Sequence, residues 1–318
     1  MKLKTLPTFG RYLKAKFGVK VAKIPVGLSG FTCPNIDGTV AKGGCTFCLN
    51  ESFSPNLAKD AKITLNLKST QNPLLEQQLK ELDLQIRTTQ KAMKMQGIKK
   101  FLVYFQSFTN TYAPFETLKT LYDKALSYPD VIGLSIGTRS DSVTDEVLDY
   151  LAQLSKTKEI WIEFGVQSVF DQTLERINRG HDAANAKEAI LKAKAKNLNV
   201  CAHLIFGLPG ENQEMMLTTA REVYNWGVDA VKYHPLYVVK NTLLANQYKA
   251  GEFAPITKEE YAAVLTMAIE IKPPHILIQR MTAGISDDTL LAPKWCGWSK
   301  NAMVAYINEA LRKAGWKI

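Results

Sequence analysis

The stretch VIGLSIGTRSDSVTDEVLDYLAQLSKTKEIWIEFGV (131–166) decides the fold class. VIGLSIG (131–137) and EIWIEFGV (159–166) are short apolar runs, which is typical of buried strands. TDEVLDYLAQLS (144–155) lies between them and has the apolar spacing of a helix, with Thr144 as its expected N-cap. A strand, a helix and a second strand in this order predict two parallel strands that are joined by a crossover helix.

The same alternation continues on both sides of this unit. Further strands are expected at 21–30, 100–105, 200–207 and 229–239, and further helices at 73–96, 114–128, 171–178, 182–197 and 213–227. Strands that alternate with helices predict an α/β fold, and six such repeats are fewer than the eight of a complete TIM barrel. We therefore predict a partial (β/α)6 TIM-like barrel, with a doubly wound open sheet as the alternative.

The last part of the chain has a different pattern. TKEEYAAVLTMAIEIK (257–272) and SKNAMVAYINEALRKAG (299–315) predict helices, and PPHILIQRMTAG (273–284) predicts one more strand. We therefore predict two units. Residues 1–240 would form the barrel and carry a cysteine loop near the N-terminus, and residues 241–318 would form an α-rich C-terminal extension that covers the barrel or contacts substrate.

Composition and charge narrow the class of protein. The chain has 318 residues, 46% of them hydrophobic, but it contains no apolar run of the roughly 18 residues that a membrane span needs. The basic N-terminus lacks the apolar core of a signal peptide, so we expect a cytoplasmic enzyme of bacterial type. A net charge of +10 favours polyanionic partners, although a solvated surface without a partner would also explain it.

Three of the five cysteines lie in CPNIDGTVAKGGCTFC (33–48), at Cys33, Cys45 and Cys48. A disulfide scaffold would have more cysteines in a shorter chain. Thiolates are the ligands that hold iron–sulfur clusters, and three of them without a fourth suit a [4Fe–4S] cluster with one open iron. Zinc is the alternative, because Cys201, Cys296 or a histidine could supply the fourth ligand that a tetrahedral site needs.

The cysteine loop also resembles a motif of a known protein family. It follows the first expected strand, and the aromatic Phe47 stands one residue before Cys48, so the loop resembles that of the radical SAM superfamily. Most members place three residues between the first two cysteines, whereas this chain places eleven, as some subfamilies do.

Longer segments carry the resemblance further, over about residues 5–315. IEFGVQSVFDQTLERINRGH (162–181) and HLIFGLPGE (203–211) resemble the Elp3/coproporphyrinogen-oxidase-like branch of the superfamily. The chain also resembles the YhcC/YtqA (MnmL)-like subfamily in YFQSFTNTYAP (104–114), HPLYVVKNTLLANQYKAGEF (234–253) and LLAPKWC (290–296).

The resemblance implies the cofactors and their chemistry. Cys33, Cys45 and Cys48 would bind three irons of a [4Fe–4S] cluster, and the open iron would bind S-adenosylmethionine (SAM) through its amino and carboxylate groups. An electron from the reduced cluster would cleave SAM, and the resulting 5′-deoxyadenosyl radical would take a hydrogen atom from the substrate. The protein would position these groups and exclude water.

The resemblance also implies roles around SAM. Phe47 is expected beside the adenine, although packing of the loop would also account for it. Gln106 and Ser107 stand where relatives have a turn that receives the amino group of SAM. Gln167 and Arg179 match a glutamine and an arginine twelve residues later that hold SAM in relatives. A guanidinium fork suits a carboxylate, although an arginine on a surface helix is the alternative.

Further polar residues follow or lie within the expected strands. Glu163 and Gln167 are four positions apart, so both can face the barrel interior. His203 stands where relatives have a polar contact to SAM, although a core histidine would look the same. Arg139 and Asp141 follow the third strand and could bind SAM or substrate, or cap the turn.

Residues after the sixth strand are expected to face the substrate. His234, Tyr237 and Lys240 are in this position, and Lys240 could meet a phosphate or carboxylate or remain solvated. Cys296 lies between two tryptophans and is a candidate substrate-side thiol, with packing as the alternative. Cys201 lies in an apolar strand and is expected in the core.

The subfamily resemblance implies a tRNA substrate. The expected reaction takes the carboxymethylaminomethyl group of a wobble uridine toward the aminomethyl form, and a partner methyltransferase then completes the modification. An electron donor such as flavodoxin or ferredoxin is also implied. A splayed-out base would stack on an aromatic side chain. The candidates are Phe108, Tyr112, Tyr237 and Trp295. The alternatives are radical SAM chemistry on a tetrapyrrole or small metabolite, and a zinc-stabilised RNA-binding module.

Overall fold

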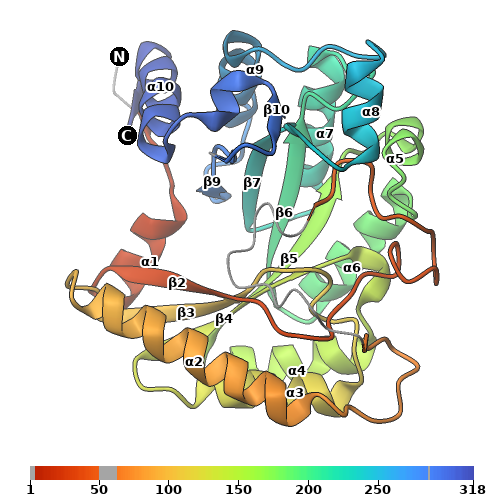
Figure 1. The fold of residues 1–318 in the computed structure, drawn as a ribbon. Coiled ribbons are helices and arrows are strands. Elements are labelled where there is room, and N and C mark those ends of the chain that lie inside the picture. The colour runs from red at the N-terminus through yellow and green to blue at the C-terminus, as the bar shows by residue number, and fades with distance from the viewer. Residues whose placement is uncertain (1–3, 50–62, 286) are drawn as a thin grey trace.

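The computed structural model describes residues 4–49, 63–285 and 287–318, and its centre is one curved, seven-stranded parallel sheet (Figure 1). The strands are β2 (Val21–Val26), β3 (Lys100–Phe105), β4 (Val131–Thr138), β5 (Glu159–Gln167), β6 (Asn199–Phe206), β7 (Ala230–Pro235) and β9 (Leu277–Arg280). Their order in the sheet follows their order in the chain and never reverses. The partial barrel is therefore confirmed, and the doubly wound alternative is wrong because such a sheet reverses its strand order at a switch point.

Helices cover the outer face of the sheet, because right-handed crossovers between parallel neighbours place every connection on the same side (Figure 1). They are α2 (Leu75–Lys94), α3 (Phe115–Leu126), α4 (Asp145–Ser155), α5 (Asp171–Arg176), α6 (Ala183–Ala195) and α7 (Gln213–Asn225). Side-chain N-caps fix where several of them begin. Thr144 caps α4 as expected, and Asp182 and Asn212 cap α6 and α7 in the same way.

Helix α1 (Phe9–Phe17) closes the inner face near the N-terminal ends of the strands, which the sequence did not predict. Phe9 and Leu13 pack on an apolar layer of the sheet. This layer consists of Leu102, Trp161, Cys201 and Ala230. The rings of Phe9 and Trp161 meet edge to face, with centroids 5.0 Å apart. Cys201 is fully buried here, as the apolar pattern of its strand predicted.

The C-terminal part adds both a sheet strand and covering helices. β9 joins β7 in the main sheet, while α8 (Leu243–Lys249), α9 (Lys258–Glu270) and α10 (Lys300–Lys313) lie at one end of the molecule (Figure 1). The remaining strands form two small sheets. β8 (Val238–Val239) pairs with β10 (Leu290–Ala292), and β1 (Lys4–Thr5) pairs with β11 (Trp316–Lys317). The two ends of the chain are therefore side by side. None of the described helices has the length and apolar character needed to cross a bilayer.

Candidate active site

The cysteine loop leaves the sheet at the C-terminal end of β2, where active sites of barrel folds form. Turn hydrogen bonds give the loop its shape. The carbonyl of Cys33 accepts from the backbone N–H of Ile36 at 2.7 Å, and the carbonyl of Cys45 accepts from the N–H of Cys48 at 2.9 Å. The loop therefore has a defined backbone around all three thiols.

The turn after α5 anchors the cysteine loop. Asn178 donates its side-chain amide to the carbonyls of Lys42 and Gly44, at 3.1 and 2.7 Å. Gly180 has a φ of +78°, and a Cβ on it would lie 2.2 Å from Oδ1 of Asn35 in the loop. Only glycine allows this close approach and this backbone conformation. The segment INRGH that carries much of the resemblance thus holds the cysteine loop in place.

Arg179 lies directly beside the cysteine loop and is buried, with an exposed fraction of 6%. Its Nη1 lies 3.6 Å from Sγ of Cys45, and its Nη2 donates to the carbonyl of Gly165 at 2.6 Å. Within the described residues, nothing accepts from its Nε. A ligand oxygen at this position would therefore satisfy a buried donor.

The side chain of Gln167 lies beside that of Arg179. A Cβ on Gly165 would lie 2.7 Å from Nε2 of Gln167 and 3.0 Å from Nη2 of Arg179, so both side chains converge over this glycine. Gln167 has a φ of +69°, which costs a non-glycine residue about 1–3 kcal/mol. Such strained positions cluster at functional sites, where the surroundings hold them.

The spacing of the loop thiols is compatible with a cluster. In the described part of the chain, one set of three His, Cys, Asp or Glu side chains has its donor atoms within 4.8 Å of one another, and it is Glu163, Cys201 and His203. The three loop cysteines are not such a set, so at least one pair of their sulfur atoms lies more than 4.8 Å apart. A cluster fits this spacing because each thiolate binds its own iron.

The charges beside the loop also fit an anionic cluster. Burial raises the pKa of the Cys48 thiol, and the neighbouring Cys45 and Cys33 raise it further. The guanidinium groups of Arg179 and Arg139 act in the opposite direction. Because thiolates are the ligands that bind iron, these two cations would stabilise the loaded loop.

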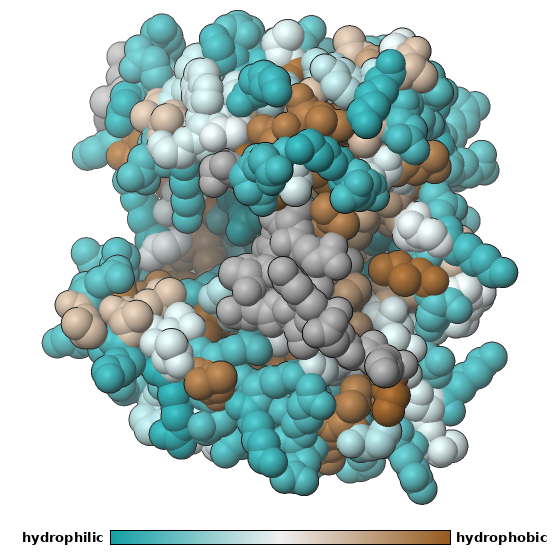
Figure 2. Space-filling model, in the orientation of Figure 1, coloured by the Kyte–Doolittle hydropathy of each residue, from teal (hydrophilic) through white to brown (hydrophobic). Residues whose placement is uncertain are grey.

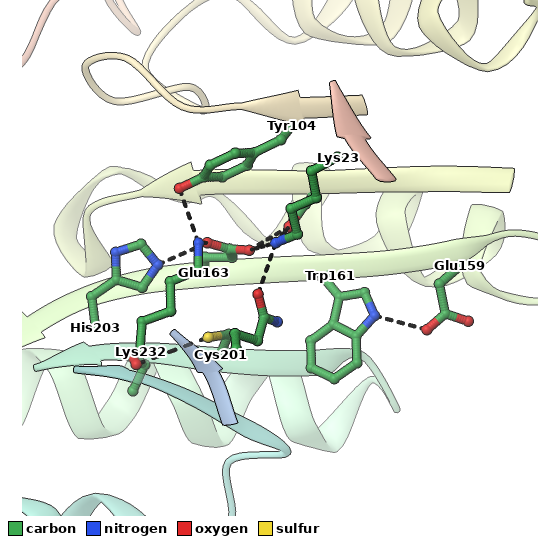
Figure 3. A network of polar contacts seen from close by, with 11 residues as sticks. Lys23, Tyr104, Glu159, Trp161, Glu163, Cys201, His203 and Lys232 are labelled. Atoms are coloured by element: carbon green, nitrogen blue, oxygen red, sulfur yellow. Dashed lines mark hydrogen bonds and ion pairs between the residues drawn. The ribbon is translucent and has the colours of Figure 1, made fainter. Parts of the chain in front are cut away.

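A buried ion network crosses the interior of the sheet (Figure 3). Glu163 has no exposed surface, and it accepts from Nζ of Lys23 at 2.7 Å and from Nε2 of His203 at 2.7 Å. Nζ of Lys232 and the hydroxyl of Ser135 also bind this carboxylate. The five side chains come from β2, β4, β5, β6 and β7, so the network ties the sheet together across its inner face.

Electrostatics fix the protonation states in this network. Burial alone would raise the pKa of Glu163, but Lys23 and Lys232 hold it well below its ordinary value. Burial, helped by Lys232, lowers the pKa of His203 to about 4, and burial and Arg280 lower that of His234 well below its ordinary value. Glu163 is therefore ionised and both histidines are neutral at pH 7. A metal at Glu163, Cys201 and His203 would have to displace two ammonium groups.

A cavity of about 1030 Å³ lies between this network and the cysteine loop. On the face that Figure 2 shows, the surface is hollowed between α10 and α2, and the residues above the hollow are mostly hydrophilic. Of the predicted site residues, the cavity is lined by Phe47, Gln106, Gln167, His203, His234 and Tyr237. Its cationic lining residues are Lys23, Arg280 and Lys300, and none of the described residues that line it is acidic.

Other predicted residues lie outside this lining. Arg139 pairs with Asp141 at 2.5 Å, and both are largely buried. Ser107 is buried, and Glu163 offers both carboxylate oxygens to the network. Nζ of Lys240 lies 3.5 Å from Asp288 at the surface. Cys296 is fully buried in the core, and burial raises the pKa of its thiol to about 12.

The aromatic residues that were predicted to stack on a base differ in whether they line the cavity. Tyr237 lines the cavity, whereas Tyr112 is buried and donates to the hydroxyl of Thr39 at 2.9 Å. Trp295 is buried too and donates to the carbonyl of Ile256 at 3.2 Å. Phe108 packs at the edge of the core with a φ of +61°.

The sequence interpretation missed the cations of the network and the cavity. Lys23 and Lys232 each interrupt an otherwise apolar strand, in VAKIPV and DAVKYHP, and this interruption was an available signal. A charge in a buried strand needs a partner, so each lysine pointed to an acid across the sheet. Arg280 gave no such signal, because it ends a short strand whose place in the sheet depends on the fold.

Comparison with known proteins gives the family. The model of the radical SAM superfamily matches residues 38–223, which include Cys45, Cys48 and the anchoring turn. The chain belongs to the radical SAM superfamily. The model of a radical SAM C-terminal domain matches residues 228–313. This radical SAM chain is 37% identical to YhcC of Escherichia coli (strain K12), over 96% of this chain and 93% of that protein. It is 34% identical to YtqA of Bacillus subtilis (strain 168), over 97% and 90%.

More distant radical SAM relatives share part of the chain or its fold. A tRNA uridine(34) acetyltransferase of Methanocaldococcus infernus is 31% identical over 157 residues, which is 48% of this chain and 29% of that protein. The solved structure of the archaeal Methanocaldococcus infernus Elp3 has a TM-score of 0.60 at 20% identity, and the match covers 93% of this chain and 64% of that one. It has the same fold.

Membership of the family settles the cofactors. The cofactors of this radical SAM protein are a [4Fe–4S] cluster and SAM. The alternative of a zinc-stabilised RNA-binding module without catalysis is therefore wrong. The subfamily resemblance is confirmed by the similarity to YhcC and YtqA over nearly the whole chain.

Proposed function

We propose that this protein is a tRNA-modifying radical SAM enzyme. It would convert the carboxymethylaminomethyl group of a wobble uridine toward the aminomethyl form. The observation that carries this proposal is the cavity, which is lined by Phe47 of the cysteine loop and by Lys23, Arg280 and Lys300, with no acidic side chain among the described residues of its lining. Its volume of about 1030 Å³ lies at the upper end of the ~300–1,000 Å³ of small-molecule sites, so a base and SAM fit together.

The cofactor end is equipped to hold a cluster and SAM. Cys33, Cys45 and Cys48 would bind the three irons, and Phe47 would lie along the adenine. Gln106 and Ser107, at the end of β3, would receive the amino group of SAM. When bound, the cluster and SAM supply a radical that can remove a hydrogen atom from the substrate.

The converging side chains of Gln167 and Arg179 would bind the carboxylate of SAM. Arg179 has an unpaired Nε–H within the described residues and is rigidly held by the carbonyl of Gly165. A guanidinium fork that is fixed in this way binds a carboxylate with little loss of side-chain entropy. Its place beside Cys45 would put that carboxylate next to the cluster.

Residues of the sheet would keep the reacting groups positioned and dry. The Glu163 network fixes Lys23 and His203 on the inner face of the sheet, and α1 seals the apolar layer beyond it. His203 is neutral and donates its Nε2–H to Glu163, so its Nδ1 can accept a hydrogen bond without bringing a charge to the site. Exclusion of water protects a radical reaction from side reactions.

The substrate end suits a nucleotide of tRNA. Tyr237 could stack on a wobble base that is turned out of the anticodon loop. The net charge of +10 and Lys300 in the lining would attract the phosphates around it. Similarity to a tRNA uridine(34) acetyltransferase over 157 residues supports a wobble-uridine substrate. An electron donor such as flavodoxin or ferredoxin and a downstream methyltransferase belong to the proposal, as does a cytoplasmic location, because reduced thiols need a reducing compartment.

Mass spectrometry of tRNA nucleosides tests this function directly. In a strain that lacks the gene, 5-carboxymethylaminomethyluridine should accumulate at the wobble position, and the aminomethyl and methylaminomethyl forms should be lost. Purified protein with a reconstituted cluster, SAM and dithionite should then restore the aminomethyl form on tRNA from that strain. An unchanged nucleoside profile would refute the tRNA proposal and favour a tetrapyrrole or small metabolite as substrate.

Replacement of Arg179 tests the SAM end of the cavity. We expect Arg179→Met to weaken SAM binding by about tenfold or more, because a charge-assisted pair with a carboxylate is lost. Arg179→Lys should retain part of the affinity. SAM affinity is measured on anaerobic, cluster-loaded protein after the iron content has been matched to that of the wild type.

The control for this comparison is Arg221→Met, which removes an exposed arginine that pairs loosely with Glu214 on α7. It should bind SAM like the wild type. Unchanged SAM affinity in Arg179→Met would contradict the role given to this guanidinium.

A further inference from the structure

Arg280 introduces an uncompensated charge at the substrate end of the cavity. It is the last residue of β9, where its backbone is in register with Lys232 of β7. Its side chain lines the cavity and is exposed. Across the described ranges, no Asp or Glu forms a salt bridge with it.

The charges around Arg280 do not balance. Burial lowers the pKa of Lys23, and even without the charge of Lys23 the positive charges of Lys232 and Arg280 exceed the one negative charge of Glu163. The neighbouring histidines add no charge, because burial keeps His203 and His234 neutral, and the field of Arg280 helps to do so. A surplus of this size beside a cavity favours an anionic ligand group.

A hydrogen-bond donor of Gln279 lies next to Arg280 in the chain. The side-chain oxygen of Gln279 accepts a hydrogen bond from Nζ of Lys23 at 2.7 Å, so the amide NH₂ of Gln279 points away from that lysine. Within the described part of the chain, nothing accepts from this buried Nε2. Buried donors are almost always satisfied, so a ligand oxygen is the partner that this corner lacks. A guanidinium with an amide beside it matches the two oxygens of a carboxylate.

We propose that Arg280, with the side-chain amide of the neighbouring Gln279, binds the carboxylate of the carboxymethylaminomethyl group of the substrate. This inference rests on the proposed function. The carboxylate of SAM is not the occupant, because the proposed function assigns that group to Arg179 at the cluster, on the turn after α5. Loss of the carboxymethyl unit would remove the anion that Arg280 holds, so the site would select the substrate and release the product.

The test uses two synthetic anticodon stem-loop RNAs that differ only in the wobble substituent, carboxymethylaminomethyl or aminomethyl. Their phosphates are identical, so any difference in affinity reports on the carboxylate. Fluorescence anisotropy is measured on anaerobic, cluster-loaded protein with SAM. We expect the wild type to bind the carboxymethylaminomethyl RNA about tenfold more tightly, Arg280→Met to bring this ratio to about one, and Arg280→Lys to fall between them.

Arg221→Met, which removes one positive charge from the outer surface, is the matched control and should keep the wild-type ratio. Equal affinities for the two RNAs in the wild type, or a ratio that survives in Arg280→Met, would overturn the proposal. Arg280→Met that weakens both RNAs equally would assign Arg280 to a phosphate instead, and a loss of SAM affinity would assign it to SAM. The nucleoside profile of the deletion strain judges the proposed function separately from all of these results.

Discussion

Replacement of Cys33, Cys45 or Cys48 with Ala is expected to abolish reductive cleavage of SAM. The three thiols share one loop, and in a radical SAM protein each would hold a different iron of the cluster. Loss of any one thiolate would leave the cluster with two protein ligands. The measurements are iron and sulfide content, and 5′-deoxyadenosine formed with dithionite, which should fall below detection.

Cys201→Ala is the matched control, because it removes a thiol that is fully buried in the apolar layer under α1. It should lower stability by a modest amount and leave the iron content unchanged. If Cys48→Ala still formed 5′-deoxyadenosine at the wild-type rate, or if Cys201→Ala lost the cluster, the assignment of the ligands would be wrong.

Replacement of Glu163 with Gln is expected to lower the free energy of unfolding by about 3–5 kcal/mol, which is the usual cost of breaking a buried ion pair. The amide keeps the size of the side chain but cannot neutralise Lys23 and Lys232, and both ammonium groups would remain buried. Urea denaturation at pH 7 measures this loss. Glu163→Gln combined with Lys232→Met should recover part of it, because one stranded charge is removed.

Glu159→Gln is the control, because it changes a second buried glutamate on the same strand. Its partner Lys16 is half exposed and can turn to water, and Trp161 and Tyr12 can still donate to the amide oxygen. We expect a loss of about 1 kcal/mol or less for this pair. Equal losses in the two variants would show that burial of the lysine partners does not decide the stability.

The effect of Glu163 should depend on pH in a defined direction. Its pKa in the folded protein lies well below the ordinary value of 4.5. Its contribution to stability is therefore complete above that ordinary value and is lost as the pH falls through the folded-state pKa. The difference between wild type and Glu163→Gln should stay constant from about pH 8 to about pH 5 and shrink below that range. A difference that instead shrinks on going from pH 8 to pH 6 would show that another group carries it.

Local patterns in the sequence determined most of the fold. Apolar runs and helical spacing predicted the strands β2 to β7 and the helices between them, because each element shows its own periodicity. The order of the strands was decided by the structure, because alternation with helices also fits a doubly wound sheet. Helix α1 was not predicted, because its short amphipathic pattern is hidden among basic residues and its burial depends on the sheet.

Some features of the candidate site could likewise be predicted from the sequence, and others depended on the tertiary structure. The sequence by itself determined the three thiols, the family and its cofactors, because ligand type and motif spacing are local properties. Only the tertiary structure decided that Gln167 and Arg179 converge at the cysteine loop, and that Lys23, Lys232 and Arg280 meet in one interior around Glu163. The physical reason is that these charged residues are far apart in the sequence. They interact only in the interior of the barrel, which forms when the seven strands pair with one another.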